Sequence, residues 1–310
     1  MVVGLVPGLV IGLREGIEAA LVVGIILAYL TKIGRQDLHR YVYRGTLAAL
    51  GGSVVAAAVF AITVGRFEGT AEELFEGFAA ILAVIVLTSM ILWMMKAAKD
   101  IRKHVEHRID VLVDRRKVLG LASLAFIAVF REGVETVLFM AGLTGASTTA
   151  DIVAGVGLGV LVAAFLGFGL FRLSWKINMR RFFQVTGIFL IVVAAGLFQL
   201  GVHELQGAYG WGLDGTVYDA KSTLPDKLPE DGSAPTAAQV GGSLLRGIIG
   251  YNDNPTQLEM LAYAAYWIFT LFVYWGVRTG KIEIVTRPLK NAWRAITRAV
   301  RRSPAKIEVR

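Results

Sequence analysis

The sequence contains no cysteine among its 310 residues and only seven prolines. The absence of cysteine excludes disulfide bonds and thiolate metal ligands, so any metal must be held by oxygen, nitrogen or thioether donors. Charged residues are scarce too, at 18% of the chain, whereas 55% of it is hydrophobic and the mean hydropathy is +0.60. This composition is unusual for a soluble domain and predicts an integral membrane protein.

Seven long apolar runs follow one another along the chain. Each is long enough for a helix to cross a hydrocarbon core about 30 Å thick. We therefore predict an all-α fold with seven transmembrane helices, at 5–31, 45–65, 74–95, 118–142, 150–172, 182–201 and 259–278.

Positive charge is concentrated in alternate connections. Of the 32 lysines and arginines, 26 lie within 32–44, 96–117, 172–181 and the segment from Arg278, at the end of the last span, to the carboxyl terminus. Because basic loops stay on the cytoplasmic side, the amino terminus is predicted outside and the carboxyl terminus inside. Topology alone accounts for the basic total, so we expect no nucleic-acid partner.

The predicted domain organisation is simple. Residues 1–280 form one transmembrane domain, whose long outer loop at 202–258 is rich in Gly, Pro, Asp and Ser. In this loop, Asn254 followed by Pro255 predicts the start of the last helix. Residues 281–310 form a basic amphipathic cytoplasmic tail, suited to the anionic inner leaflet of the bilayer or to a cytoplasmic partner.

One charged motif occurs twice. Arg-Glu-Gly-Ile-Glu stands at 14–18 in the first span, and Arg-Glu-Gly-Val-Glu stands at 131–135 in the fourth. The two spans are predicted to cross the membrane in opposite directions. Spans 1–3 and 4–6 therefore look like inverted repeats, with the seventh span added, an arrangement typical of secondary transporters whose sites lie near the bilayer midplane.

The repeated motif predicts a cation site. Glu15 and Glu18 share one helix face, as do Glu132 and Glu135, and Glu15 lies about 15 Å along its span, near mid-bilayer. Arg14 and Arg131 offset part of this charge, leaving a formal sum of −2. Carboxylate oxygens suit hard or borderline cations such as iron, manganese, magnesium and calcium. The alternative is that each motif is an internally neutralised pair that holds the two helices together.

At these residues the chain resembles the oxidase-dependent iron permease family, and in particular its bacterial branch. The resemblance also covers "EELFEG" at 72–77, "GVHELQGAYGW" and "SLLRGIIGYNDNPTQLEMLAYAAYW". It implies translocation of iron, Fe(II) or Fe(III), from outside to the cytoplasm. The residues that match the family's transport motif are Arg14, Glu15, Glu18, Arg131, Glu132 and Glu135.

The chain departs from the fungal pattern in its last outer loop, where Asp214 and Asp219 are only loosely arranged. This departure leaves open how a separate ferroxidase would hand over iron.

A second acidic group stands at the predicted outer face and consists of Glu68, Glu72, Glu73 and Glu76. It would concentrate cations at the entrance, although carboxylates at a helix amino terminus are also favoured by the helix dipole alone. His203 and Glu204, at the outer end of the sixth span, are candidates either for an interfacial anchor or for metal contact. A histidine ligand would favour Fe(II) over calcium or magnesium.

Small residues form a stripe in the first span, at Gly8, Gly12, Gly16, Ala20 and Gly24. Their spacing of four predicts close approach of another helix backbone, and we hypothesise that this span moves.

Together these features predict a multi-pass iron permease of the cell membrane. It would be a transporter rather than an enzyme, with iron as its substrate, no organic cofactor, and an outer oxidase or iron donor as a partner. Two alternatives stay open: an intramembrane di-iron carboxylate enzyme, and a proton-coupled transporter of another solute that uses the Glu–Arg pairs as relays.

Overall fold

The structure is a computed structural model. It describes residues 4–64, 68–97, 109, 112–113, 118–144, 148–172, 178–213, 215–226, 229, 234 and 236–279. The predicted amphipathic tail at 281–310 and Asp214 lie outside these residues, as does most of the basic connection at 96–117. The chain divides into two compact units, Met1–Tyr263 and Ala264–Arg310.

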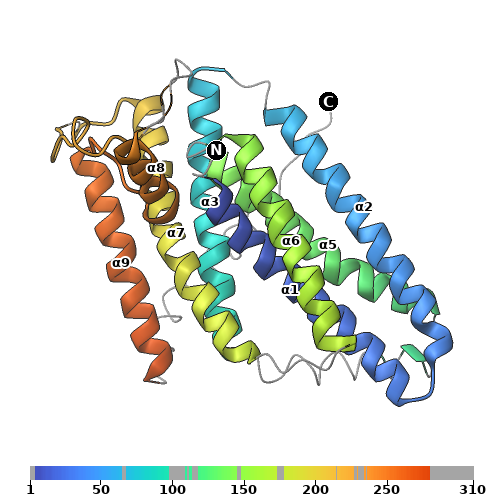
Figure 1. Cartoon of the computed structure of the whole chain (residues 1–310). Coiled ribbons are helices and arrows are strands. Elements are labelled where there is room, and N and C mark those ends of the chain that lie inside the picture. Colours follow the sequence, from blue (N-terminus) through green and yellow to red (C-terminus); the bar gives the residue numbers. More distant parts are fainter. Residues whose placement is uncertain are drawn as a thin grey trace, which may run out of the picture. The chain divides into compact units, whose positions relative to one another are not determined.

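The described residues are helical, which confirms the all-α class. Their one β-type pairing is an isolated bridge between Thr216 and Thr256. The helices, labelled in Figure 1, are α1 (Leu5–Lys32), η1 (Gln36–Leu38), α2 (His39–Val64), α3 (Thr70–Ala97), α5 (Val118–Leu143), α6 (Thr149–Arg172), α7 (Met179–Tyr209), α8 (Ala237–Ile249) and α9 (Gln257–Arg278).

Each predicted span coincides with one long helix. Within the part of the chain that the structure describes, five helices are long and apolar enough to cross a membrane, and they are α2, α3, α6, α7 and α9. The two other long helices, α1 and α5, each carry three charged residues near their middle, in the repeated motif. The charged residues of the motif, and not a lack of length, keep α1 and α5 out of this count.

The predicted outer loop is shorter and more ordered than the sequence indicated. Helix α7 continues to Tyr209, and 237–249 forms α8. Thr236 caps α8, because its side chain accepts a hydrogen bond from the Gln239 N–H while Oε1 of Gln239 accepts one from the Thr236 N–H. The helix ends at Gly250, whose φ of 71° suits glycine.

The start of the last helix differs from the prediction in detail. Helix α9 begins at Gln257, two residues beyond Pro255. Its first turn is capped by Thr256, whose Oγ1 accepts a hydrogen bond from the Glu259 N–H, at 3.3 Å. Asn254 instead donates its own N–H to Asn252 Oδ1 in the preceding turn. The predicted capping residue was therefore wrong by two positions, because Thr256 and not Asn254 caps the first turn.

Three pairs of helices make the most extensive contacts in the first unit: α1 with α6, α2 with α5, and α3 with α7. Helix α1 also packs against α5, and smaller contacts join α3 to α5 and α1 to α7. The pairing brings the two motif-bearing helices together, although they are far apart in the sequence.

The glycine stripe of α1 lies against α6, as its spacing predicted. A Cβ on Gly8 would lie 2.8 Å from the backbone oxygen of Ile152, and a Cβ on Gly12 would overlap the backbone oxygen of Val156. A Cβ on Gly16 would lie 2.6 Å from that of Ala163. These close approaches fix the position of the first motif relative to α6.

Candidate metal site between α1 and α5

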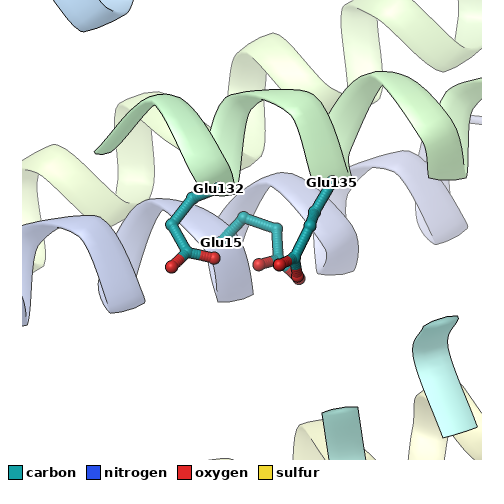
Figure 2. A group of neighbouring side chains, drawn as sticks. All are labelled: Glu15, Glu132 and Glu135. Carbon is teal, nitrogen blue, oxygen red and sulfur yellow. The ribbon is translucent and has the colours of Figure 1, made fainter. Parts of the chain in front are cut away.

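The side chains of the two motifs converge where α1 contacts α5. Figure 2 shows Glu15 reaching from α1 toward Glu132 and Glu135 of α5. One carboxylate oxygen from each of these three residues lies within 4.8 Å of the other two. Among the described residues, this is the one set of three or more histidine or acidic side chains that meets this condition. A single cation could contact all three carboxylates.

The α1 copy of the motif is almost completely buried. Arg14 is 1% exposed and Glu15 is 2% exposed. Nη1 of Arg14 donates a hydrogen bond to Glu15 Oε1 at 3.0 Å, and its Nη2 lies 3.2 Å from Glu18 Oε1. Nη1 also lies 3.6 Å from the sulfur of Met90 in α3. A buried guanidinium therefore balances the two carboxylates of its own helix.

The α5 copy pairs in the same way but is less enclosed. Arg131 donates from Nη2 to Glu132 Oε1 at 2.6 Å, and its Nε lies 3.5 Å from Glu135 Oε1. Its side chain is nevertheless 54% exposed, whereas that of Glu132 is 4% exposed. The second motif thus has one side against α1 and another side open.

The carboxylates retain unused acceptor capacity. Three of their oxygens are buried without a hydrogen-bond donor or an ion-pair partner, namely Glu15 Oε2, Glu132 Oε2 and Glu135 Oε2, while Glu18 Oε1 has only its ion pair with Arg14. Buried polar atoms without partners cost free energy, and they are rare in folded proteins unless a ligand satisfies them. The atoms available to bind a metal ion are all carboxylate oxygens. Such ligands suit the hard or borderline cations expected from the sequence.

Glu18 belongs to the group only partly. It is 8% exposed and interacts electrostatically with Glu132 and Glu135, but its carboxylate is outside the three-residue set. Its proximity to Arg14 places it at the edge of the cluster. The structure therefore brings three of the four predicted ligands together and leaves the fourth beside them.

The outer acidic residues do not assemble at ligand distance. Glu68 and Glu72 are exposed, while Glu73 and Glu76 are partly buried. Glu73 lies against Gly207 of α7. Its negative charge repels that of the neighbouring Glu204. This arrangement can attract cations, but within the described chain it does not form a preorganised site like that of the central glutamates.

His203 has a partner that the sequence did not reveal. Its Nδ1 lies 2.8 Å from Oε1 of Glu259, at the start of α9, and Glu259 is only 1% exposed. A carboxylate in the first turn of a predicted span is ordinarily explained by the helix dipole, so Glu259 gave no separate signal. The fold shows its role because α7 and the first turn of α9 lie side by side here.

Comparison with known protein families finds a match over nearly the whole chain. The model of the "Iron permease FTR1 family" matches residues 5–286, a range that includes both motifs. The chain belongs to the iron permease FTR1 family. No solved structure matches it.

Individual relatives of this FTR1 family member agree with that assignment. It is 31% identical over 272 residues to the ferrous iron permease EfeU of Escherichia coli O6:H1, covering 87% of this chain and 94% of the relative. It is 31% identical over 263 residues to the EfeU of Yersinia pestis, covering 84% and 90%. An uncharacterized protein of Archaeoglobus fulgidus is 42% identical over 196 residues, covering 63% and 68%. With its apolar helices, this FTR1 family member is a multi-pass protein of the cell membrane.

Proposed function

We propose that this protein imports iron across the cell membrane through a single site built from both motifs. Glu15, Glu132 and Glu135 bind the ion, and Glu18 contributes from the edge of the group. Arg14 and Arg131 limit the negative charge of the empty site. The observation that carries this proposal is the set of three buried carboxylate oxygens without donors, one each from Glu15, Glu132 and Glu135, contributed by two helices that meet at one place.

Fe(II) is the ion that fits the site best. The four glutamates and two arginines carry a formal charge of −2, which a dication neutralises and a trication reverses. Net charge buried in a low-dielectric environment is unfavourable, so the neutral complex is favoured. The relatives named ferrous iron permeases are consistent with this choice.

The proposed topology has seven spans, with the amino terminus outside and the repeated units inverted. The helix pairing supports it. If α1, α2 and α3 are exchanged with α5, α6 and α7 respectively, the α1–α6 pair becomes the α5–α2 pair, while the α3–α7 and α1–α5 pairs map onto themselves. Such exchange symmetry is what two inverted repeats produce, and it puts a site shared by α1 and α5 on the pseudo-symmetry axis near mid-bilayer.

The transport cycle follows from this symmetry. Cations gather at the acidic group of Glu68, Glu72, Glu73 and Glu76 on the outer face, where an iron-donor protein would deliver Fe(II). Iron then binds the central carboxylates. Rocking of one repeat against the other opens the inner side and releases it. No chemical conversion of the ion by this chain is required, and we propose a transporter rather than an enzyme.

Uptake by reconstituted protein tests the proposal. We expect proteoliposomes containing the wild-type chain to accumulate radiolabelled iron supplied as Fe(II), and to do so faster than with Fe(III). Glu132→Gln should reduce the initial rate more than tenfold, because it removes a charged ligand while preserving side-chain size. Asp37→Asn, which changes an exposed carboxylate paired with Arg35, is the control. Wild-type rates in Glu132→Gln would refute the central site.

A further inference from the structure

A polar cavity of about 220 Å³ lies apart from the central glutamates, in the first compact unit. Its walls come from α7, α8, the turn at 250–254 and the first turn of α9. The polar side chains that line it include Gln199, His203, Asp226, Arg246, Asn252 and Glu259. Nothing in the proposed central site accounts for this cavity.

Glu259, in the cavity wall, is held in place by hydrogen bonds from several side chains. Its carboxylate accepts hydrogen bonds from the Asn252 amide at 2.7 Å and the Gln199 amide at 3.4 Å, in addition to the one from His203. Three donors directed at one buried carboxylate stabilise its ionised form. An ionised carboxylate cannot donate, so Nδ1 of His203 must carry the proton of that hydrogen bond.

This hydrogen bond determines what the rest of the ring can do. A neutral imidazole with its proton on Nδ1 has a lone pair on Nε2. The His203 side chain is 52% exposed although its Nδ1 is against buried Glu259. A carboxylate that orients a histidine in this way is the usual support of a histidine metal ligand.

The charges around the cavity suit a cation. Asp226, Asp253 and Glu259 exceed Arg246 and Lys221 by one negative charge, and Arg246 donates to Asp226 at 3.1 Å. The negative field reaches Tyr251, whose hydroxyl pKa is raised by partial burial and then by Asp253 and Asp226. A dication would be attracted here but would not be held by a complete shell of protein ligands.

The cavity also has a suitable position along the helices. Leu143, the last residue of α5, lines it and lies eight residues beyond Glu135, or about 12 Å at 1.5 Å per residue. Glu204, next to His203, interacts with Glu72 and Glu73 of the outer acidic group. The cavity therefore lies toward the ends of α5 and α7 that are near the outer acidic group.

We propose that this cavity is a second, transient metal site, in which Nε2 of His203 binds the incoming divalent transition-metal ion and Glu259 orients the ring. Water and the nearby carboxylates complete the coordination. A nitrogen ligand selects Fe(II) over Mg(II) and Ca(II) before the ion reaches the all-oxygen central site. This role rests on the proposed function for the identity of the cargo, but the binding itself can be tested independently.

The test is Fe(II) binding under anaerobic conditions, by calorimetry on detergent-purified full-length protein. The Glu15→Gln, Glu132→Gln double variant removes the central site, so we expect one weaker ion per chain to remain. Adding His203→Asn should weaken that binding more than tenfold. Asparagine keeps an amide donor close to the Nδ1 position and removes Nε2, so a purely structural role predicts no change. His39→Asn, in α2, is the matched control.

A second readout does not depend on affinity. Fe(II) should protect His203 of the double variant from carbethoxylation by diethyl pyrocarbonate, as measured by mass spectrometry of its peptide, and should leave His39 reactive. If His203→Asn unfolds at a lower temperature than the parent, the protection measurement replaces the calorimetric comparison as the test of the proposal. Undiminished binding in a stable His203→Asn protein, or no protection of His203, would overturn the proposal. If either of these results were found and Glu132→Gln still lost iron uptake, the cavity proposal would be wrong and the central site would be retained.

Discussion

The two copies of the Arg-Glu-Gly-x-Glu motif have nearly the same sequence but different surroundings. Arg14 is 1% exposed and lies among Glu15, Glu18 and Met90, whereas the Arg131 side chain is 54% exposed. Each motif has one glycine against a neighbouring helix, Gly16 against Ala163 of α6 and Gly133 against Ser53 of α2, so the difference lies in the arginines. The same five residues are therefore enclosed in one helix and partly open in the other.

This difference suggests a division of labour within one site. The α1 copy provides a rigid half, because its arginine is buried and lies against α3. The α5 copy provides the accessible half, since Arg131 is in contact with both of its glutamates and with the surroundings. Changes at equivalent positions should then have unequal effects, and the following comparisons test that expectation.

The largest difference is expected between the arginines. Arg14→Gln should destabilise the protein by about 3–5 kcal/mol, because it leaves two buried carboxylates without their counter-charge. Arg131→Gln should cost less, about 1–3 kcal/mol, since Arg131 is 54% exposed although its partner Glu132 is 4% exposed. Unfolding temperatures in detergent measure both. Equal losses of stability would mean that the two copies have equivalent surroundings, against the structure.

The glycine contact of α1 should give the next largest effect. Gly12→Ala places a Cβ against the Val156 backbone, which cannot rotate away, and should destabilise by about 1–3 kcal/mol. Gly157→Ala, in α6, meets no atom within 4 Å and is the matched control, with an unchanged or slightly higher unfolding temperature. If the two alanine variants unfold alike, the close approach of α1 to α6 is wrong.

Met90 should give the smallest effect. Met90→Leu keeps the volume and removes the sulfur 3.6 Å from Nη1 of Arg14, so the stability change should stay below about 1.5 kcal/mol. Because the guanidinium loses one restraint, we expect Fe(II) to bind a few-fold more weakly, as measured by anaerobic calorimetry. A tenfold or greater loss would assign Met90 a larger part in the site than this contact implies.

Much of the helical framework could be predicted from the sequence, because hydrophobic length and capping residues are local signals. The predicted span at 118–142 and the helix Val118–Leu143 differ by one residue at one end. The repeat of the motif also indicated correctly which helices would meet. The pattern of period four at Gly8, Gly12 and Gly16 indicated a close helix contact without naming the partner.

Helix α8 was missed although the Thr236–Gln239 capping box and Gly250 are local signals, because the Gly, Pro and Ser content of its segment is typical of a loop. Other features depend on tertiary contacts and left no local signal. The partnership of His203 with Glu259 joins residues 56 positions apart. The unequal exposure of Arg14 and Arg131 is invisible in two nearly identical motifs, because it depends on tertiary contacts such as that of Arg14 with Met90 of α3.

The most direct test of the shared site is the stoichiometry of tight Fe(II) binding to purified protein in which His203→Asn has removed the cavity site. We predict one ion per chain, lost equally in Glu15→Gln and in Glu132→Gln, because each substitution removes a ligand of the same ion. If one substitution abolishes binding and the other leaves it intact, the two motifs do not bind one ion together, and the central claim is contradicted.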